Sequence, residues 1–154
     1  MCTVPAEPLR VKLSRLPGNE DLPLPAYATQ QSAGADLRAA VATARWLAPG
    51  QRALIPTGFR LALPAGYEAQ VRPRSGRALR EGLTLLNSPG TIDADYRGEL
   101  RILVVNHGRR PLLLKRGDRI AQLIIAPVSR VAFEEVGRLP ETPRGAGGFG
   151  HTGD

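Results

Sequence analysis

The sequence predicts an all-β domain, either a sandwich or a barrel. Apolar segments rich in strand-forming residues recur at short spacing, and Pro/Gly clusters such as 56–58 and 64–66 separate them. Residues 67–71 also alternate between apolar and polar side chains, as expected when one face of a strand is buried. Short strands with turns at this density are typical of all-β folds.

The predicted strands extend from residue 11 to residue 136. Residues 33–40 have helix propensity, but loops flank them on both sides, so we expect a strand or a bulge. We expect residues 100–106 and 111–114 to form a hairpin across 107–110. The predicted strands are residues 11–13, 33–40, 51–55, 59–63, 67–71, 100–106, 111–114, 119–128 and 131–136, and residues 83–86 are apolar without an assigned strand.

One short helix is predicted, after residues 72–76. Ser75 is the expected N-cap, residues 77–81 the helical turns, and Gly82 the residue that ends them. Residues 16–26 contain three prolines and a glycine, so we expect them to be irregular.

The chain is expected to form one β domain, residues 1–139, followed by a glycine-rich arm, residues 140–154. A length of 154 residues makes a single domain the default. The arm cannot supply a core, and on its own it would be a mobile terminus. Arg144 and Phe149 are spaced along it, which suggests instead an arm that orders over a ligand.

Composition limits the chemistry. One Cys and two His exclude a disulfide framework and a Cys/His zinc site, so any metal is expected to be a hard cation such as Mg²⁺. The formal charge of +7 comes almost entirely from Arg, which favours a phosphate-bearing partner, although a solvated surface explains most of these residues. Nucleic-acid binding is not indicated, because the sequence has no basic stripe interleaved with aromatic residues. Without a long apolar run or a signal peptide, the chain is expected to be cytoplasmic and not membrane-bound.

Residues 85–100, LLNSPGTIDADYRGEL, concentrate the polar chemistry between two apolar runs. In an extended segment Asp93 and Asp95 would point the same way. Two carboxylates on one face are costly neighbours unless a cation, a hydrogen bond or a reaction uses them. We therefore expect an active-site hairpin here.

Five segments together resemble the trimeric deoxyuridine triphosphatase family, and they occur in the family's order and at similar spacing. Any one of them alone would be a weak signal, whereas the combination of GTIDADYRG with a downstream glycine-rich arm is highly specific. The segments are AGADLRAA (33–40), RPRSGRA (72–78), LLNSPGTIDADYRGEL (85–100), RGDRIAQLI (116–124) and TPRGAGGFGHTG (142–153).

The resemblance implies a small jelly-roll, β-barrel-like domain of the β-clip type. It implies a homotrimer with active sites shared between subunits, and hydrolysis of dUTP to dUMP and pyrophosphate with Mg²⁺. That reaction would keep uracil out of DNA and supply dUMP for dTMP synthesis. Arg77 departs from the apolar residue that the family usually has after PRSG.

The resemblance also assigns roles within 85–100. Asp93 would be the general base that activates water for attack on the α-phosphorus, although an isolated Asp here would more often cap a turn. Asp95 would pair with an Arg at the subunit interface, ahead of any direct chemical role. The Tyr96 ring would lie under the deoxyribose and exclude a 2′-hydroxyl. Asn87 and the backbone of Gly90, Thr91 and Ile92 would bind the uracil edge.

The phosphates would be bound by other segments. Arg74, Ser75 and Gly76 would form a phosphate loop. Gln122, grouped with Asp93 as catalytic, would either donate to a phosphate or satisfy a buried neighbour, and the resemblance favours the phosphate. Asp36 would hold a water of the magnesium shell, or else form a salt bridge to Arg38 or another Arg. In the arm, Phe149 would stack on uracil, Arg144 would bind the terminal phosphate, and glycines such as Gly148 would let the backbone wrap closely.

Two alternatives remain open. A dCTP deaminase of the same fold would need a Glu to move protons at the pyrimidine amine, and Glu99 is the only Glu close to the turn. A non-catalytic Arg-rich β module that binds nucleic acid would explain the charge, but it leaves Asp93, Asp95 and the arm without a purpose.

Overall fold

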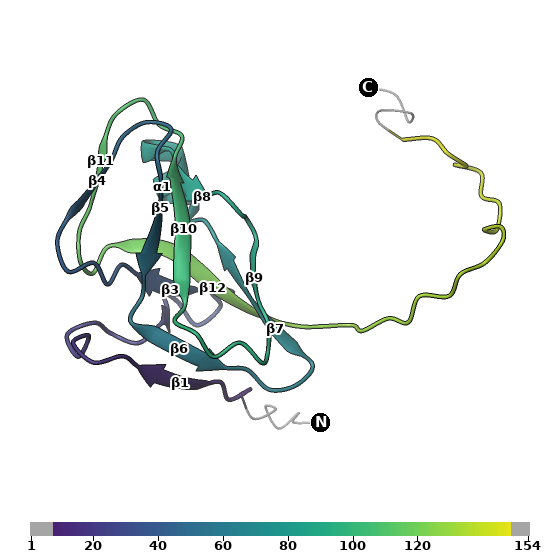
Figure 1. The fold of residues 1–154 in the computed structure, drawn as a ribbon, viewed down its shortest axis with the longest axis horizontal. Helices are drawn as coiled ribbons and strands as arrows, with labels where there is room; N and C mark the ends of the chain where they lie inside the picture. Colours follow the sequence, from purple (N-terminus) through teal and green to yellow (C-terminus); the bar gives the residue numbers. More distant parts are fainter. Residues whose placement is uncertain (1–7, 149–154) are drawn as a thin grey trace.

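The strands of the chain surround one apolar core, and a long C-terminal segment leaves the body after the last of them (Figure 1). The computed structural model describes residues 8–148. The elements are β1 Lys12–Arg15, β2 Ala26–Tyr27, β3 Ala35–Arg38, β4 Arg45–Leu47, β5 Arg52–Pro56, β6 Phe59–Ala62, β7 Tyr67–Arg72, α1 Ser75–Glu81, β8 Leu83–Leu85, β9 Gly90–Ile92, β10 Arg101–Asn106, β11 Leu112–Leu114 and β12 Arg119–Pro127.

All strand pairs are antiparallel. The largest sheet has the order β2-β3-β12-β7-β9, and a second has the order β5-β10-β8. Two further pairs, β1-β6 and β11-β4, complete the body. The predicted all-β domain with one short helix is confirmed.

Alternating side chains from these sheets form the core. In β5, Ala53 and Ile55 are buried while Arg52 and Leu54 are exposed, which is the period-two pattern of a strand with one covered face. In β12, by contrast, Ile120 and Ala121 are both buried, because a register shift interrupts its pairing with β3 between Arg119 and Ala121.

The predicted hairpin of residues 100–106 and 111–114 is wrong. Strand β11 pairs with β4, where Leu113 is opposite Trp46. Strand β10 pairs with β5 on one edge and with β8 on the other. Because both edges of β10 already have partner strands, β11 cannot pair with β10. It forms a separate two-stranded sheet with β4 instead.

The predicted strand at residues 131–136 is also wrong. These residues have no regular secondary structure, and the side chains of Val131, Phe133 and Val136 are 68%, 97% and 48% exposed. An isolated extended segment has no neighbour to accept its backbone hydrogen bonds. Figure 1 shows the chain leaving the body directly after β12. The domain boundary at residue 139 stays a prediction.

The helix ends as predicted but begins differently. Gly82 is the C-cap, with the left-handed φ of 74° that glycine adopts without steric cost. A Cβ at Gly82 would lie only 2.2 Å from the backbone nitrogen of Gly108, so a side chain would also collide with the neighbouring turn. The N-cap is Arg74 and not Ser75, and no side chain caps the first turn.

Residues 16–25 are irregular, as predicted, whereas Ala26, also expected to be irregular, begins β2. Contacts from Arg116 hold part of this segment. Its guanidinium forms two hydrogen bonds to the Asp21 carboxylate, at 2.8 and 2.6 Å, and a third to the Gly18 carbonyl. The hydrogen bond from Arg116 lowers the pKa of Asp21. No helix among residues 8–148 is long and apolar enough to cross a bilayer.

Asn106 is fully buried, and its side chain forms hydrogen bonds to three backbone groups. Its Nδ2 donates to the carbonyls of Leu47 and Arg110, both at 2.9 Å, and its Oδ1 accepts from the Gly108 N–H at 2.8 Å. These bonds satisfy a polar group that would be costly to bury alone. They also fix the turn after β10 against the end of β4.

Replacing Asn106 by Ala should lower the free energy of unfolding by at least about 2 kcal/mol, because buried carbonyls lose their donor. Urea unfolding at one fixed protein concentration measures this change. His107→Ala is the matched control: that side chain is exposed, so a shift of less than about 0.5 kcal/mol is expected. Equal stability of the two variants would contradict the role of Asn106.

Candidate active site

Residues 85–100 do not form a hairpin of paired strands. Strand β8 pairs with β10, whereas β9 pairs with β7 at the edge of the five-stranded sheet. Strand β9 ends at Ile92, and the backbone then turns, with the Tyr96 N–H donating to the Asp93 carbonyl at 3.2 Å. The extended geometry predicted for Asp93 and Asp95 is therefore wrong. Both carboxylates are nevertheless exposed and line one shallow pocket beside β7.

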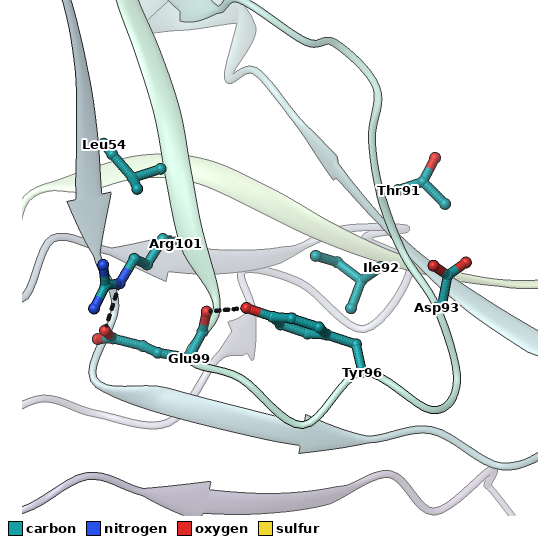
Figure 2. A pocket seen from close by; sticks show the side chains of 7 residues that line it. All are labelled: Leu54, Thr91, Ile92, Asp93, Tyr96, Glu99 and Arg101. Carbon is teal, nitrogen blue, oxygen red and sulfur yellow. Dashed lines mark hydrogen bonds and ion pairs between the residues drawn. The ribbon is translucent and has the colours of Figure 1, made fainter.

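A pocket of about 470 Å³, here named the Tyr96 pocket, lies between this turn and strands β5 and β10 (Figure 2). It contains Thr91, Ile92, Asp93 and Tyr96 of the predicted site. Figure 2 shows the Tyr96 ring directed toward Glu99, with Thr91 and Asp93 on the other side of the backbone. The lining residues are Leu54, Thr91, Ile92, Asp93, Tyr96, Glu99 and Arg101.

The position of the Tyr96 ring is fixed at both ends. Its hydroxyl donates to the carbonyl of Glu99 at 3.1 Å. The ring lies so close to Gly98 that a Cβ there would be 2.3 Å from the phenol oxygen. Glycine at position 98 therefore lets an aromatic ring lie flat against the backbone and form one wall of the pocket.

Glu99 has structural partners for both of its carboxylate oxygens. Oε1 accepts from the backbone N–H of Gly58 at 3.1 Å, and Oε2 accepts from Nε of Arg101 at 2.9 Å. The same turn is held by Thr57, which donates to the Leu100 carbonyl at 2.6 Å. A carboxylate committed to a backbone amide and a guanidinium is poorly placed to shuttle protons, which is what a deaminase would need from it.

A separate pocket, of about 420 Å³ and here named the arginine pocket, lies between β3, β12 and the start of α1. It contains the other predicted residues of the body: Asp36, Arg74, Ser75, Gly76 and Gln122. The lining residues are Ala28, Ser32, Ala33, Gly34, Asp36, Arg74, Ser75, Gly76, Arg80, Arg119 and Gln122.

Asp36 organises the cations of the arginine pocket. Its Oδ1 lies 2.8 Å from Nε of Arg74, and its Oδ2 lies 3.2 Å from Nη1 of Arg119. The salt bridge expected as the alternative reading of Asp36 is therefore present, to these two arginines and not to Arg38. One carboxylate that accepts from two guanidinium groups orients both of them.

Gln122 is held beside Asp36, its partner across the β3-β12 pair. Its Nε2 donates to the Pro73 carbonyl at 2.9 Å, which joins β12 to the loop before α1. A Cβ at Gly34 would lie 2.4 Å from Oε1 of Gln122. The small residue at 34 thus leaves room for the amide, whose oxygen faces the pocket wall.

Sequence reasoning missed Arg119 and Arg80. In a regular strand, Arg119 and Gln122 would lie on opposite faces, being three residues apart. The register shift between Arg119 and Ala121 changes this alternation, so both residues line one pocket. Only Arg119 carried a sequence signal, because it belongs to the RGDRIAQLI segment.

Other predicted residues lie outside both pockets. Asn87 lines neither, although its Nδ2 would be 3.2 Å from a Cβ at Gly90, so the two residues are adjacent. Arg144 donates to the Gly147 carbonyl at 2.8 Å, within the segment that leaves the body. Gly148 ends the described chain, and Phe149 lies outside the described residues. Among residues 8–148 of one chain, no salt bridge joins Asp95 to an Arg, and the pair expected for Asp95 at a subunit interface stays a prediction.

The comparisons with known proteins agree with one another. The sequence pattern of the dUTPase family matches residues 20–153. Deoxyuridine 5'-triphosphate nucleotidohydrolase from Rhizobium rhizogenes is 54% identical over 145 residues, which cover 93% of each chain.

Solved structures show the same fold. A dUTPase mutant of Staphylococcus bacteriophage 80alpha with dUpNHpp superposes with a TM-score of 0.80 at 25% identity, covering 94% of this chain and 99% of that one. A dUTPase mutant of phage phi11 of S. aureus has a TM-score of 0.75 at 23% identity, covering 86% and 99%. The match over most of the chain and the 54% identity are decisive: this chain belongs to the dUTPase family and is a dUTP diphosphatase that hydrolyses dUTP.

Proposed function

We propose that hydrolysis takes place in sites shared between the subunits of a homotrimer, with Asp93 as the base and Mg²⁺ as the cofactor. The observation that carries this proposal is the separation of the predicted site into two pockets. The Tyr96 pocket holds the candidate base, the arginine pocket holds the candidate phosphate ligands, and the two pockets have no lining residue in common. Two copies of the chain can supply the two halves of one site.

The Tyr96 pocket suits a deoxyuridine. Strand β9 is an edge strand, so one side of its backbone has no partner strand within the described residues. Free amide and carbonyl groups of Gly90, Thr91 and Ile92 would pair with the uracil edge, assisted by Asn87. The fixed ring of Tyr96 would lie against the deoxyribose, where a 2′-hydroxyl would collide with it.

Asp93 is suited to accept a proton from the attacking water. Its side chain is exposed at the rim of the pocket, and neither of its oxygens has a recorded hydrogen-bond partner among residues 8–148. A carboxylate with free lone pairs can hold a water for attack on the α-phosphorus. This distinguishes Asp93 from Asp36, whose oxygens contact Arg74 and Arg119.

The arginine pocket suits the triphosphate. Arg74 can form a two-bonded contact with phosphate oxygens, Ser75 can donate its hydroxyl, and Gly76 lets the anion approach the backbone. Gln122, fixed by Pro73, would face the phosphates from β12. From the arm, Arg144 and Gly148 would bind the terminal phosphate, and Phe149 would stack on uracil. Closure of the arm would exclude water from the site.

The residues present fit a magnesium ion that is bound mainly through the nucleotide. No group of three or more His, Cys, Asp or Glu residues within 8–148 could form an all-protein site. Magnesium commonly keeps several waters and binds through phosphates, and Asp36 would hold one such water. The ion would neutralise charge on the triphosphate. The phage phi11 dUTPase coordinates a structural Mg(II) ion. Activity titrated with a chelator tests the requirement here.

Asp93→Asn should reduce turnover of dUTP by about 100-fold or more, because the amide cannot accept the proton from water. Binding of dUpNHpp should stay within about twofold of wild type, because the side chain keeps its shape. Pyrophosphate release and calorimetry measure the two effects. Asp95→Asn, in the same turn, is the control and should keep most of the activity. Near-normal turnover by the Asp93→Asn variant would show that Asp93 is not the general base.

Tyr96→Ala should relax the discrimination against UTP, because it removes the wall proposed to exclude the 2′-hydroxyl. The ratio of kcat/KM for dUTP to that for UTP is the quantity to measure, and we expect it to fall by about tenfold or more. Leu54→Ala changes the opposite wall of the same pocket and should affect both nucleotides alike. If UTP remains equally poor, the ring does not select the sugar.

Mixing two inactive variants tests the shared site directly. Asp93→Asn and Gln122→Ala alter different pockets, so after joint unfolding and refolding some sites would combine two intact halves. Random assembly should restore about a quarter of the wild-type activity per chain. Asp93→Asn mixed with Tyr96→Ala alters one pocket twice, so no site regains an intact Tyr96 pocket, and the activity of this control mixture should not exceed the mean of its two parent variants. Absence of recovery in the first mixture would place the whole site within one subunit.

A further inference from the structure

Two arginines of α1 have different surroundings. Nε and Nη2 of Arg77 lie 2.7 and 2.5 Å from Oε2 of Glu81, one helical turn away. Nη1 of Arg77 also lies 3.7 Å from Oδ2 of Asp118, in the turn before β12. The Arg77 side chain is only 13% exposed. Arg77 therefore pairs with Oε2 of Glu81, whose side chain is the one carboxylate of α1.

Arg80 lies instead over the predicted phosphate loop. Its Nη1 and Nη2 would be 3.0 and 3.4 Å from a Cβ at Gly76, the residue four positions earlier on the same helix face. The guanidinium lines the arginine pocket and is exposed. Within residues 8–148 its side chain has no recorded hydrogen bond or salt bridge. The absence of a side chain at Gly76 is what leaves room for it.

The charge of the arginine pocket is unbalanced. Its lining contains three guanidinium groups, those of Arg74, Arg80 and Arg119, and a single carboxylate, that of Asp36. Both oxygens of Asp36 already contact Arg74 and Arg119. Arg77 pairs with the only carboxylate of α1, and within residues 8–148 Arg80 forms no salt bridge with Glu81 or Asp36. An anion with several oxygens would satisfy all three cations.

We infer that Arg80 is a further substrate-binding residue, which contacts the β- or γ-phosphate of dUTP from within the body of the protein. This inference rests on the proposed assignment of the arginine pocket to the triphosphate. It also gives Arg77 a role: the ion pair with Glu81 keeps that carboxylate away from Arg80. The contact would add to the one proposed for Arg144 of the arm.

Calorimetry on the full chain tests Arg80 with three ligands: dUpNHpp, dUMP and inorganic tripolyphosphate. Arg80→Ala should weaken binding of dUpNHpp and of tripolyphosphate by about tenfold, the effect of losing one charge-assisted hydrogen bond. Binding of dUMP, which lacks the outer phosphates, should change by less than about twofold. Arg80→Lys keeps the charge but loses the planar fork, so it should recover only part of the affinity.

Arg60→Ala is the matched control, because it removes the same charge from an exposed position of β6, away from α1 (Figure 1). It should leave all three affinities unchanged. If Arg80→Ala binds tripolyphosphate with wild-type affinity, the inference is overturned. It is also overturned if the affinities for dUMP and dUpNHpp fall equally, because that result indicates a structural effect. Tripolyphosphate binding requires neither the catalytic base nor turnover. It therefore tests the role of Arg80 even if the proposal of a site shared between subunits is wrong.

Discussion

The arrangement of the arginine pocket depends on one carboxylate, that of Asp36. It lies on β3 and contacts Arg74, which precedes α1, and Arg119, which begins β12. Strand β12 lies at the centre of the five-stranded sheet, so the same carboxylate connects the sheet's central strand to the loop before the helix. The Asp36 side chain is 15% exposed, and two cations compensate for its partial burial. The pocket is thereby left with more positive charge than its own residues neutralise.

The strands were predictable where local sequence determines them. Residues 59–63 and 67–71 correspond closely to β6 and β7, because turns punctuated by Pro and Gly bound them on both sides. Pairing was not predictable from the same information. The partner of β11 depends on whether β10 has a free edge, and that depends on β5 and β8, which are distant in sequence. Residues 131–136 have strand propensity but no edge to pair with, and propensity alone does not form a strand.

In the candidate site, too, residues fixed by local sequence were predictable, whereas residues placed by distant contacts were not. Tyr96 and its neighbours could be predicted because they are contiguous, and the fixed position of the ring follows from Gly98 two residues later. Arg119 depends on a register shift in β12, which no local pattern indicates. Arg80 depends on the absence of a Cβ at Gly76 and on the engagement of Glu81 by Arg77. These are three-dimensional conditions, so even a highly specific set of motifs did not include it.

The separation of the two pockets has a consequence for catalysis. The candidate base, Asp93, lies in a turn that follows an edge strand. The candidate phosphate ligands lie instead around the central strand β12, where the carboxylate of Asp36 orients Arg74 and Arg119. Neither half alone places water in line with a phosphorus atom. In the proposed arrangement the nucleotide would connect them, because its base and sugar would occupy one pocket and its phosphates would balance the charge of the other. Substrate binding and the alignment of the reacting groups would then be the same event, which suits a reaction that depends mainly on positioning and electrostatic stabilisation.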